Sequence, residues 1–276
     1  MDGFLNKHLA WIVVAALALP GFAGVADAQD SLPPDPTGDR LIMSAGFLSG
    51  HPDLRYRLLG LKEFKRGNHE DAFSFFRRAA FYADKPSQGM VAEMLWNGQG
   101  TQRDPVLAYA WMDLAAERGY TGFLGLRERY WSALDEVQRA TAIAEGQAIY
   151  AQYGDEAAKP RQATAMLRER RKLTGSRTGF AGNVQIYVPG PSGVEVVDSS
   201  RFYDNRYWDP KQYAQWQDGI WTNPRVGRVT VGEIEKVMEN GRTPSSRIPA
   251  VTPAVDAIEP TTPSRDETGL GTKNDE

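Results

Sequence analysis

Hydrophobic and small residues in the middle of the chain recur at the spacing of an α-helix, and the pattern occurs twice. In each copy a small residue, an aromatic residue and an alanine pair fall on one face of a 3.6-residue helix. Such a repeat predicts helix–turn–helix units that stack side by side. The first copy is Ala72, Phe75, Ala79 and Ala80, and the second, 36 residues later, is Ala108, Trp111, Ala115 and Ala116.

Polar residues, proline and glycine mark where these helices should begin and end. Asn68 and Asp104 stand at N-cap positions, and Pro105 suits the first helical position after Asp104. A third, weaker helical pair is expected over residues 121–154, with Asp135 as the N-cap of its second helix. Four glycines stand where helices should end in a left-handed conformation: Gly67, Gly98, Gly100 and Gly119.

Further along the chain, hydrophobic and polar positions alternate instead. Residues 180–190 and 194–197 show this alternation, which predicts a β-hairpin, and residues 227–237 predict another strand. Between them, residues 202–221 hold seven aromatic side chains around a short helix expected to start at Pro210. The predicted fold is therefore mainly α: an α-helical repeat of two to three units, followed by a small β-rich module.

The first residues have the organisation of a secretory signal peptide. Lys7 precedes an unbroken apolar run, Leu9–Leu19, and a small-residue site, Ala26-Asp27-Ala28, follows. The run has 11 residues, whereas a helix needs about 20 to span a bilayer. We therefore expect cleavage between Ala28 and Gln29, no membrane span afterwards, and a periplasmic or secreted location.

The remaining composition mainly excludes functions. The chain has no cysteine, which excludes disulfides, thiolate metal sites and the lipid anchor of a lipoprotein. It has three histidines and lacks the H-E-x-x-H, P-loop and G-x-S-x-G sequences. Its net charge of −3 argues against nucleic-acid binding by the chain as a whole. No catalytic residue, metal ligand or cofactor is therefore expected.

These differences divide the chain into six segments. The last one is rich in proline and lacks aromatic residues, so it has too little apolar surface to offset its ordering entropy and is predicted to be disordered. The segments are 1–28 (signal peptide), 29–52 (flexible leader), 53–153 (helical repeats), 154–177 (basic helix), 178–239 (small β-rich aromatic module) and 240–276 (disordered tail).

The helical repeats resemble a known family. Residues 90–120 resemble the Sel1-like repeat, a relative of the tetratricopeptide repeat, and residues 56–80 look closer to a tetratricopeptide repeat. The resemblance implies an α-solenoid that binds a protein or peptide partner and performs no catalysis. The residues that carry it are packing residues of the repeat: Gly98, Gly100, Asp104, Ala108, Trp111, Ala115, Ala116 and Gly119.

Two features outside the repeats are candidates for binding, and each also has a structural interpretation. In the basic helix, Arg168, Arg170 and Arg171 suit an acidic partner, but such charges usually mark a solvated face. In the aromatic module, Trp208 and Trp216 suit stacking on sugar rings, but a small module also needs aromatic side chains for its core.

The sequence favours two hypotheses of function over a third, a hydrolase, which would need a cleft with converging carboxylates. The first is an exported adaptor or scaffold that binds a protein or peptide through its repeats. The alternative is a cell-wall glycan-binding protein that uses the aromatic segment Phe202–Trp221 together with the basic helix.

Overall fold

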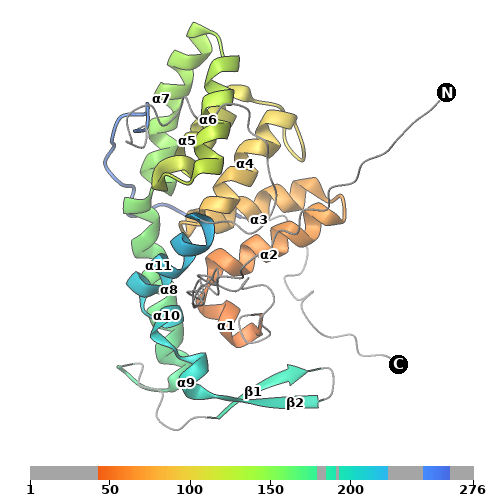
Figure 1. Ribbon diagram of the computed structural model, residues 1–276, viewed down its shortest axis with the longest axis vertical. Coiled ribbons are helices and arrows are strands. Elements are labelled where there is room, and N and C mark those ends of the chain that lie inside the picture. Colours follow the sequence, from red (N-terminus) through yellow and green to blue (C-terminus); the bar gives the residue numbers. More distant parts are fainter. Residues whose placement is uncertain (1–42, 179–184, 191–192, 223–244, 262–276) are drawn as a thin grey trace, which may run out of the picture. The chain divides into compact units, whose positions relative to one another are not determined.

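Helices make up most of the computed structural model, which describes residues 43–178, 185–190, 193–222 and 245–261 (Figure 1). The only sheet within these ranges is a two-stranded antiparallel hairpin. The fold is therefore mainly α with a small β-containing segment, as predicted. The predicted signal peptide, with Ala28 and Gln29, and the predicted strand at 227–237 lie outside the described residues.

The elements fall into a repeat region, α2 to α7, and the elements on either side of it. Their bounds in chain order are α1 Ala45–Gly50, α2 Pro52–Lys65, α3 His69–Phe81, α4 Lys85–Asn97, α5 Pro105–Ala115, the short 3-10 helix η2 Ala116–Arg118, α6 Thr121–Ala133, α7 Glu136–Tyr153, α8 Asp155–Thr174, β1 Gln185–Gly190, β2 Gly193–Asp198, α9 Ser199–Phe202, α10 Asn205–Trp208 and α11 Pro210–Thr222.

Helices of the repeat region pack against their neighbours in the chain. α2 packs against α3, α4 packs against α5, and contacts between α3 and α4 join the two pairs. α6 and α7 both pack on α5, and α7 also reaches α3. The predicted helix–turn–helix repeats are therefore confirmed, and the third helical pair is present as α6 and α7 (Figure 1).

Three predicted N-caps give different results. The Asp104 carboxylate accepts from the backbone N–H groups of residues 106 and 107, and Asp135 forms a capping box with Gln138. Both predictions are confirmed. Asn68 stands at the N-cap of α3, but its side chain makes no capping bond. Its side-chain amide donates instead to the carboxylate of Glu63, at 2.7 Å. The predicted N-cap position of Asn68 is therefore correct, but the predicted capping hydrogen bond is wrong.

The four predicted glycines all adopt positive φ angles. Gly98 ends α4 with φ +68°, and Gly100 has φ +70°. At Gly100 a Cβ atom would also lie well inside contact distance of the carbonyl oxygen of His69, at the start of α3. The loop between α4 and α5 therefore lies backbone against backbone on the preceding repeat, which only glycine permits.

The small residues of the pattern let the repeat helices approach closely. Ala72 and Ala108 are fully buried, and a Cβ at Gly60 would lie 2.6 Å from the Phe76 ring. Trp96 stacks on Tyr130 with ring centroids 4.1 Å apart, which joins α4 to α6. One continuous apolar core results, from α3 through α7.

A second core joins elements that precede and follow the repeat region. Its side chains come from α1, α2, α8 and the segment α9–α11. The predicted flexible leader is thus wrong over α1, because Phe47 and Leu48 are buried in this core. On α8, Met166 packs in this core, while Leu167 is exposed.

The aromatic module is less β-rich in the described residues than its sequence suggests. β1 and β2 pair in the predicted hairpin, with Tyr187 opposite Val196. The aromatic segment that follows is helical, as α9, α10 and α11. α11 begins at Pro210, as predicted, and Asp209 caps it by accepting from the backbone N–H of Gln212.

The predicted disordered tail is wrong over residues 245–261. This segment has no helix or strand, yet it lies against the repeat helices, and Ile248 is only 4 % exposed. We call residues 245–261 the C-terminal strap. Its contacts come from far along the chain, so the local composition did not reveal them.

Candidate functional site

The predicted repeat-signature residues lie in the packed interior or at helix ends. Of these residues, only Ala116 borders either of the two cavities described below. Their role is therefore to position the helices. Their exposed fractions are 0 % for Ala108 and Ala115, 3 % for Ala116 and 5 % for Trp111, while Gly98, Gly100, Asp104 and Gly119 stand at helix ends or in the loop between helices.

The tryptophans proposed for glycan stacking are buried. Trp208 is 0 % exposed, and its indole N–H donates to the carbonyl of Phe202 at 2.6 Å. Trp216 is 8 % exposed and meets Tyr207 edge to face. Their rings are covered by other side chains, so neither offers an open platform for a sugar ring. The structure thus places both in the core.

The three candidate arginines of α8 do not converge on one site. Arg170 lies 3.4 Å from the carbonyl oxygen of Trp208, which ties α8 to the second core. The Arg171 guanidinium donates to the carbonyl of Leu167 within the same helix, and Arg168 is exposed. Neither of the two cavities described here is lined by any of the three.

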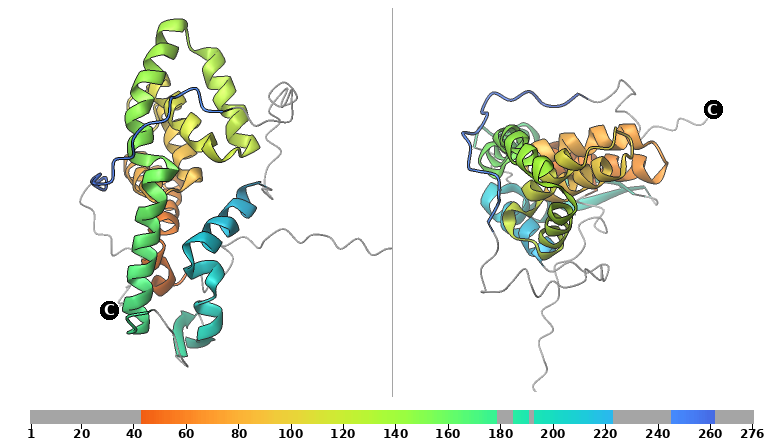
Figure 2. Two further views of the ribbon diagram at one scale, coloured as in Figure 1. Left: turned by 90° about the vertical axis from the view of Figure 1, so that its left-hand side faces the viewer. Right: turned by 90° about the horizontal axis from the view of Figure 1, so that it is seen from above.

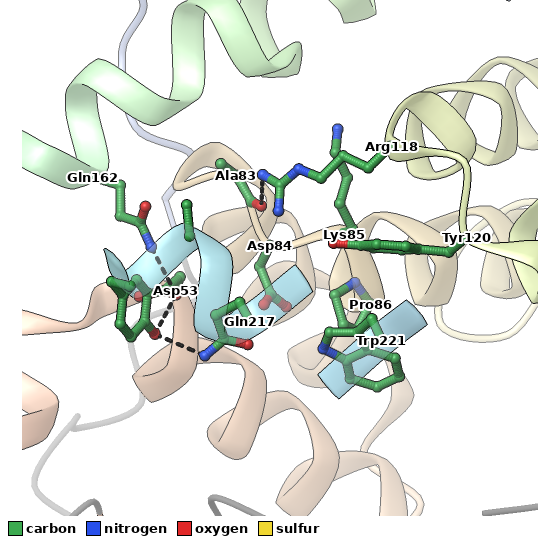
Figure 3. Close-up of a pocket in the computed structure, with 12 residues that line it drawn as sticks. Asp53, Ala83, Asp84, Lys85, Pro86, Arg118, Tyr120, Gln162, Gln217 and Trp221 are labelled. Carbon is green, nitrogen blue, oxygen red and sulfur yellow. Dashed lines mark hydrogen bonds between the residues drawn. The ribbon is translucent and has the colours of Figure 1, made fainter. Parts of the chain in front are cut away.

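A buried polar cluster joins α2, α8 and α11 (Figure 3). Oδ2 of Asp53 accepts from the Tyr213 hydroxyl at 2.8 Å and from the Gln162 amide at 2.9 Å. Gln217 donates in turn to the Tyr213 hydroxyl. Burial raises the pKa of Tyr213, and the Asp53 charge raises it further, so the phenol stays a neutral donor.

Beside this cluster, ion pairs join α4, η2, α8 and α11. Lys85, fully buried, contacts Glu117 at 2.5 Å and Asp155 at 3.2 Å. Arg118 binds Asp155 with two nitrogens and reaches Asp218 at 3.2 Å. Burial alone would raise the pKa of Asp155, but Lys85 and Arg118 outweigh burial and hold that pKa far below its usual range.

The cavity inside this polar cluster is too small for a ligand. Its volume is about 10 Å³, which suits roughly one water molecule. Oδ1 of Asp53 has no hydrogen-bond partner among the described residues. The cluster therefore serves mainly to hold α8 and α11 against the repeats.

The C-terminal strap crosses the repeat helices at a different place (Figure 2). Its backbone N–H at Ala254 donates to the carbonyl of Ala151 on α7 at 2.6 Å. The Gln152 amide donates to the carbonyl of Ile258 at 3.4 Å. Most of its other polar contacts run through side chains, so the attachment differs from the main-chain pairing of a β-strand.

Arg247 is the most specifically held residue of the strap. Its guanidinium makes two hydrogen bonds to the carboxylate of Glu128 on α6, at 2.9 and 2.5 Å. The same group lies 4.6 Å from the ring centroid of Trp131 and 3.4 Å from the hydroxyl of Tyr109. Carboxylate, aromatic face and hydroxyl together form a guanidinium-binding pocket.

The two neighbours of Arg247 also have their own partners. Ile248 enters the core above Gly146 of α7, where a Cβ atom would overlap its side chain. The Ser246 hydroxyl donates to the carboxylate of Asp113 on α5. Three consecutive side chains are therefore recognised separately by α5, α6 and α7, which fixes the register of the strap.

The far end of the strap is held by an acidic side chain. Glu259 accepts from Arg78 at 2.8 Å and from the Tyr82 hydroxyl at 2.7 Å, both on the first repeat. Burial raises the pKa of Tyr82, and its bond to Glu259 raises it further, so this phenol also donates. The strap thus spans all three helical pairs.

A cavity of about 410 Å³ lies between the strap and the helices. Asp113, Arg127 and Tyr150 line it from the helices, and residues 245–253 contribute much of the other side. The strap therefore fills only part of the space between itself and the repeats.

Sequence reasoning missed this site entirely. Arg247 and Ile248 stand among small residues and prolines with no periodic pattern around them. Glu128 lies 119 residues away from Arg247 along the chain. No local signal connects residues at that separation.

The described residues offer neither a metal site nor a membrane-spanning helix. Among the described ranges, no group of three or more histidine, aspartate or glutamate side chains is placed to hold a metal ion. None of the helices in that part of the chain combines the length and apolar character needed to cross a membrane.

Stacked helical pairs with a shared core define the class of helical-hairpin repeat proteins. Within that class, the Sel1 repeat matches residues 56–80 and 86–120, which cover α2 with α3 and α4 through η2. The chain therefore contains two Sel1 repeats, at the positions of its first two helical pairs. No curated protein and no solved structure matches it.

Proposed function

We propose that this chain is an exported scaffold whose repeat surface binds an extended segment of a protein partner. The proposal rests on the C-terminal strap, a non-helical segment that the repeat helices bind. Individual side chains of the strap each contact a separate site on these helices. A surface that accepts one extended segment in this way has the features needed to accept another. Sel1 repeats themselves suggest protein partners.

The alternative of a glycan-binding protein has less support. It relied on an exposed aromatic platform at Phe202–Trp221, and six of the seven aromatic side chains there are buried. The strap surface instead offers carboxylates and a tryptophan face. This surface holds a guanidinium and a buried isoleucine side chain, which a peptide carries and an uncharged sugar chain lacks.

Peptide selection would test the binding function without assuming a ligand sequence. A displayed library of random peptides is selected on the mature chain with Arg247→Ala, which loosens the strap. We expect enriched peptides that bind this variant and that lose binding when Trp131→Ala is added. Selection of no peptide, or of peptides indifferent to Trp131, would contradict the proposal.

Export rests on the sequence of residues 1–28. The test is N-terminal sequencing of the protein recovered from the periplasmic fraction or medium of bacterial cells that express it. A mature chain that begins at Gln29 is expected, whereas an intact Met1 in the cytoplasmic fraction would refute this part.

A further inference from the structure

The guanidinium pocket on α6 is built for arginine in particular. The two carboxylate oxygens of Glu128 accept from the two terminal nitrogens of Arg247, and Trp131 lies against the face of the guanidinium. Lysine carries a point charge, which can form neither the two parallel bonds nor the stacking of a planar group. The pocket therefore discriminates between the two basic side chains.

The carboxylate of Glu128 remains charged at neutral pH. Burial would raise its pKa, but Arg247 and the adjacent Arg127 outweigh burial and lower it. Arg127 lies 2.8 Å from Glu128 and also approaches Asp113, at 3.5 Å. Because Arg127 fixes the carboxylate in place, the pocket is organised by residues outside the strap.

The second recognition element is the buried apolar site that holds Ile248, which we call the seat of Ile248. Gly146 leaves room on α7 for a branched aliphatic side chain, and Ala110 lies close by on α5. The seat is apolar and buried, whereas the arginine pocket is partly open: the Arg247 side chain is 32 % exposed. This surface therefore recognises an arginine followed by a branched aliphatic residue.

The strap is held in a manner that allows exchange. Solvent reaches the Arg247–Glu128 pair, whose side chains are 32 % and 26 % exposed, and screening by water limits how strongly the pair holds the strap. The cavity of about 410 Å³ under the strap shows that its fit is incomplete. A ligand with the same two side chains and a larger residue toward the cavity would make more contacts than the strap does.

We propose that the strap is an internal copy of the partner's recognition segment, and that the partner presents an exposed, extended Arg-Ile or Arg-Val sequence that displaces it. This inference rests on the proposed function and adds the chemistry of the ligand. As a tethered competitor, the strap keeps the site occupied until the partner's segment is present at a sufficient concentration.

The experiment is a titration of a fluorescein-labelled peptide with the sequence of residues 243–252, followed by fluorescence anisotropy. The full mature chain and its Arg247→Ala variant are compared. We expect the variant to bind the peptide roughly tenfold or more tightly, because its own strap competes less. Addition of Glu128→Gln to the variant should abolish this gain.

Variant peptides test the arginine directly and leave the protein unchanged, so misfolding cannot explain the result. Peptides with Arg247→Lys or Ile248→Ser are expected to bind at least about tenfold more weakly than the native peptide. Equal binding of the lysine peptide, or no binding of the native peptide to the Arg247→Ala chain, would overturn the inference.

The outcomes also separate the inference from the proposed function. If the random selection yields peptides that depend on Trp131 but lack arginine, the repeat surface binds peptides and the arginine chemistry is wrong. If the mature chain forms a dimer that the native peptide dissociates, the strap of a second copy is the occupant, and the assignment to a different protein is overturned.

Discussion

At the scale of single residues, Gly100 shows why the repeat signature requires glycine. Two separate constraints act at this position: a left-handed backbone, and the proximity of the His69 carbonyl. Gly67 has the first constraint without the second, since nothing lies near its missing Cβ. The two glycines therefore allow the contributions to be separated.

We predict that Gly67→Ala lowers the free energy of unfolding by about 1–2 kcal/mol, the cost of a left-handed conformation for a residue with a Cβ. Gly100→Ala should cost roughly 1–3 kcal/mol more, because the new methyl group also overlaps the His69 backbone. Urea denaturation of both variants measures the difference, and equal losses would contradict the close approach seen between the repeats.

Residues whose role is local could be predicted from the sequence, and residues whose role depends on distant partners could not. Asp104 and Asp135 cap helices through backbone groups two or three positions away, which spacing reveals. His51 had no such signal. It stacks on Phe47 at 4.0 Å and also contacts the carbonyl of Tyr207, which lies 156 residues further on.

At the scale of elements, the second core is shared between the predicted leader and the aromatic module. Neither segment has enough apolar surface to form a core alone. Together α1, α8 and α9–α11 enclose one another. Trp208 lies at the centre, and a Cβ at Gly50 of α1 would come within 2.6 Å of its ring. The pairing of these elements is a tertiary property that hydrophobic periodicity does not encode.

Trp208→Ala should therefore destabilise the protein by about 3–5 kcal/mol, as expected for loss of a fully buried aromatic side chain. Tyr187→Ala is the matched control, because Tyr187 is 63 % exposed on β1 and should change stability by no more than about 0.5 kcal/mol. Denaturant unfolding compares the two. A loss below about 1 kcal/mol for Trp208→Ala would mean that the second core does not form in solution.

At the scale of the whole molecule, two parts of the described chain are attached to the repeat helices, one permanently and one more weakly. The permanent one is the buried junction of α8 and α11 with the repeats, where Lys85 and Asp155 are enclosed. The weaker one is the C-terminal strap, attached mostly through side chains at its two ends. The strap contributes one buried apolar side chain, Ile248, to the repeat core, so its opening disrupts less of a core than release of α8 and α11 would, and regulated binding belongs there.

The variant Gly146→Ala tests whether the strap can be released while the repeat helices stay folded. The added methyl group overlaps Ile248, and overpacking costs about 1–3 kcal/mol, so the released fraction of the strap should rise roughly fivefold or more. The same change favours α7 itself, because alanine exceeds glycine in helix propensity by about 1 kcal/mol. We therefore expect faster trypsin cleavage after Arg247 with no loss of thermal stability in the repeats.

Gly122→Ala, on α6 with open space around it, is the control and should leave the cleavage rate at Arg247 unchanged. Cleavage after Arg247 reports the released population as long as the strap opens and closes faster than the protease acts. If Gly146→Ala lowers the melting temperature and accelerates cleavage throughout the repeats, the strap and the repeats unfold as one unit. Release by a partner would then require partial unfolding of the scaffold, and a freely exchanging strap would be excluded.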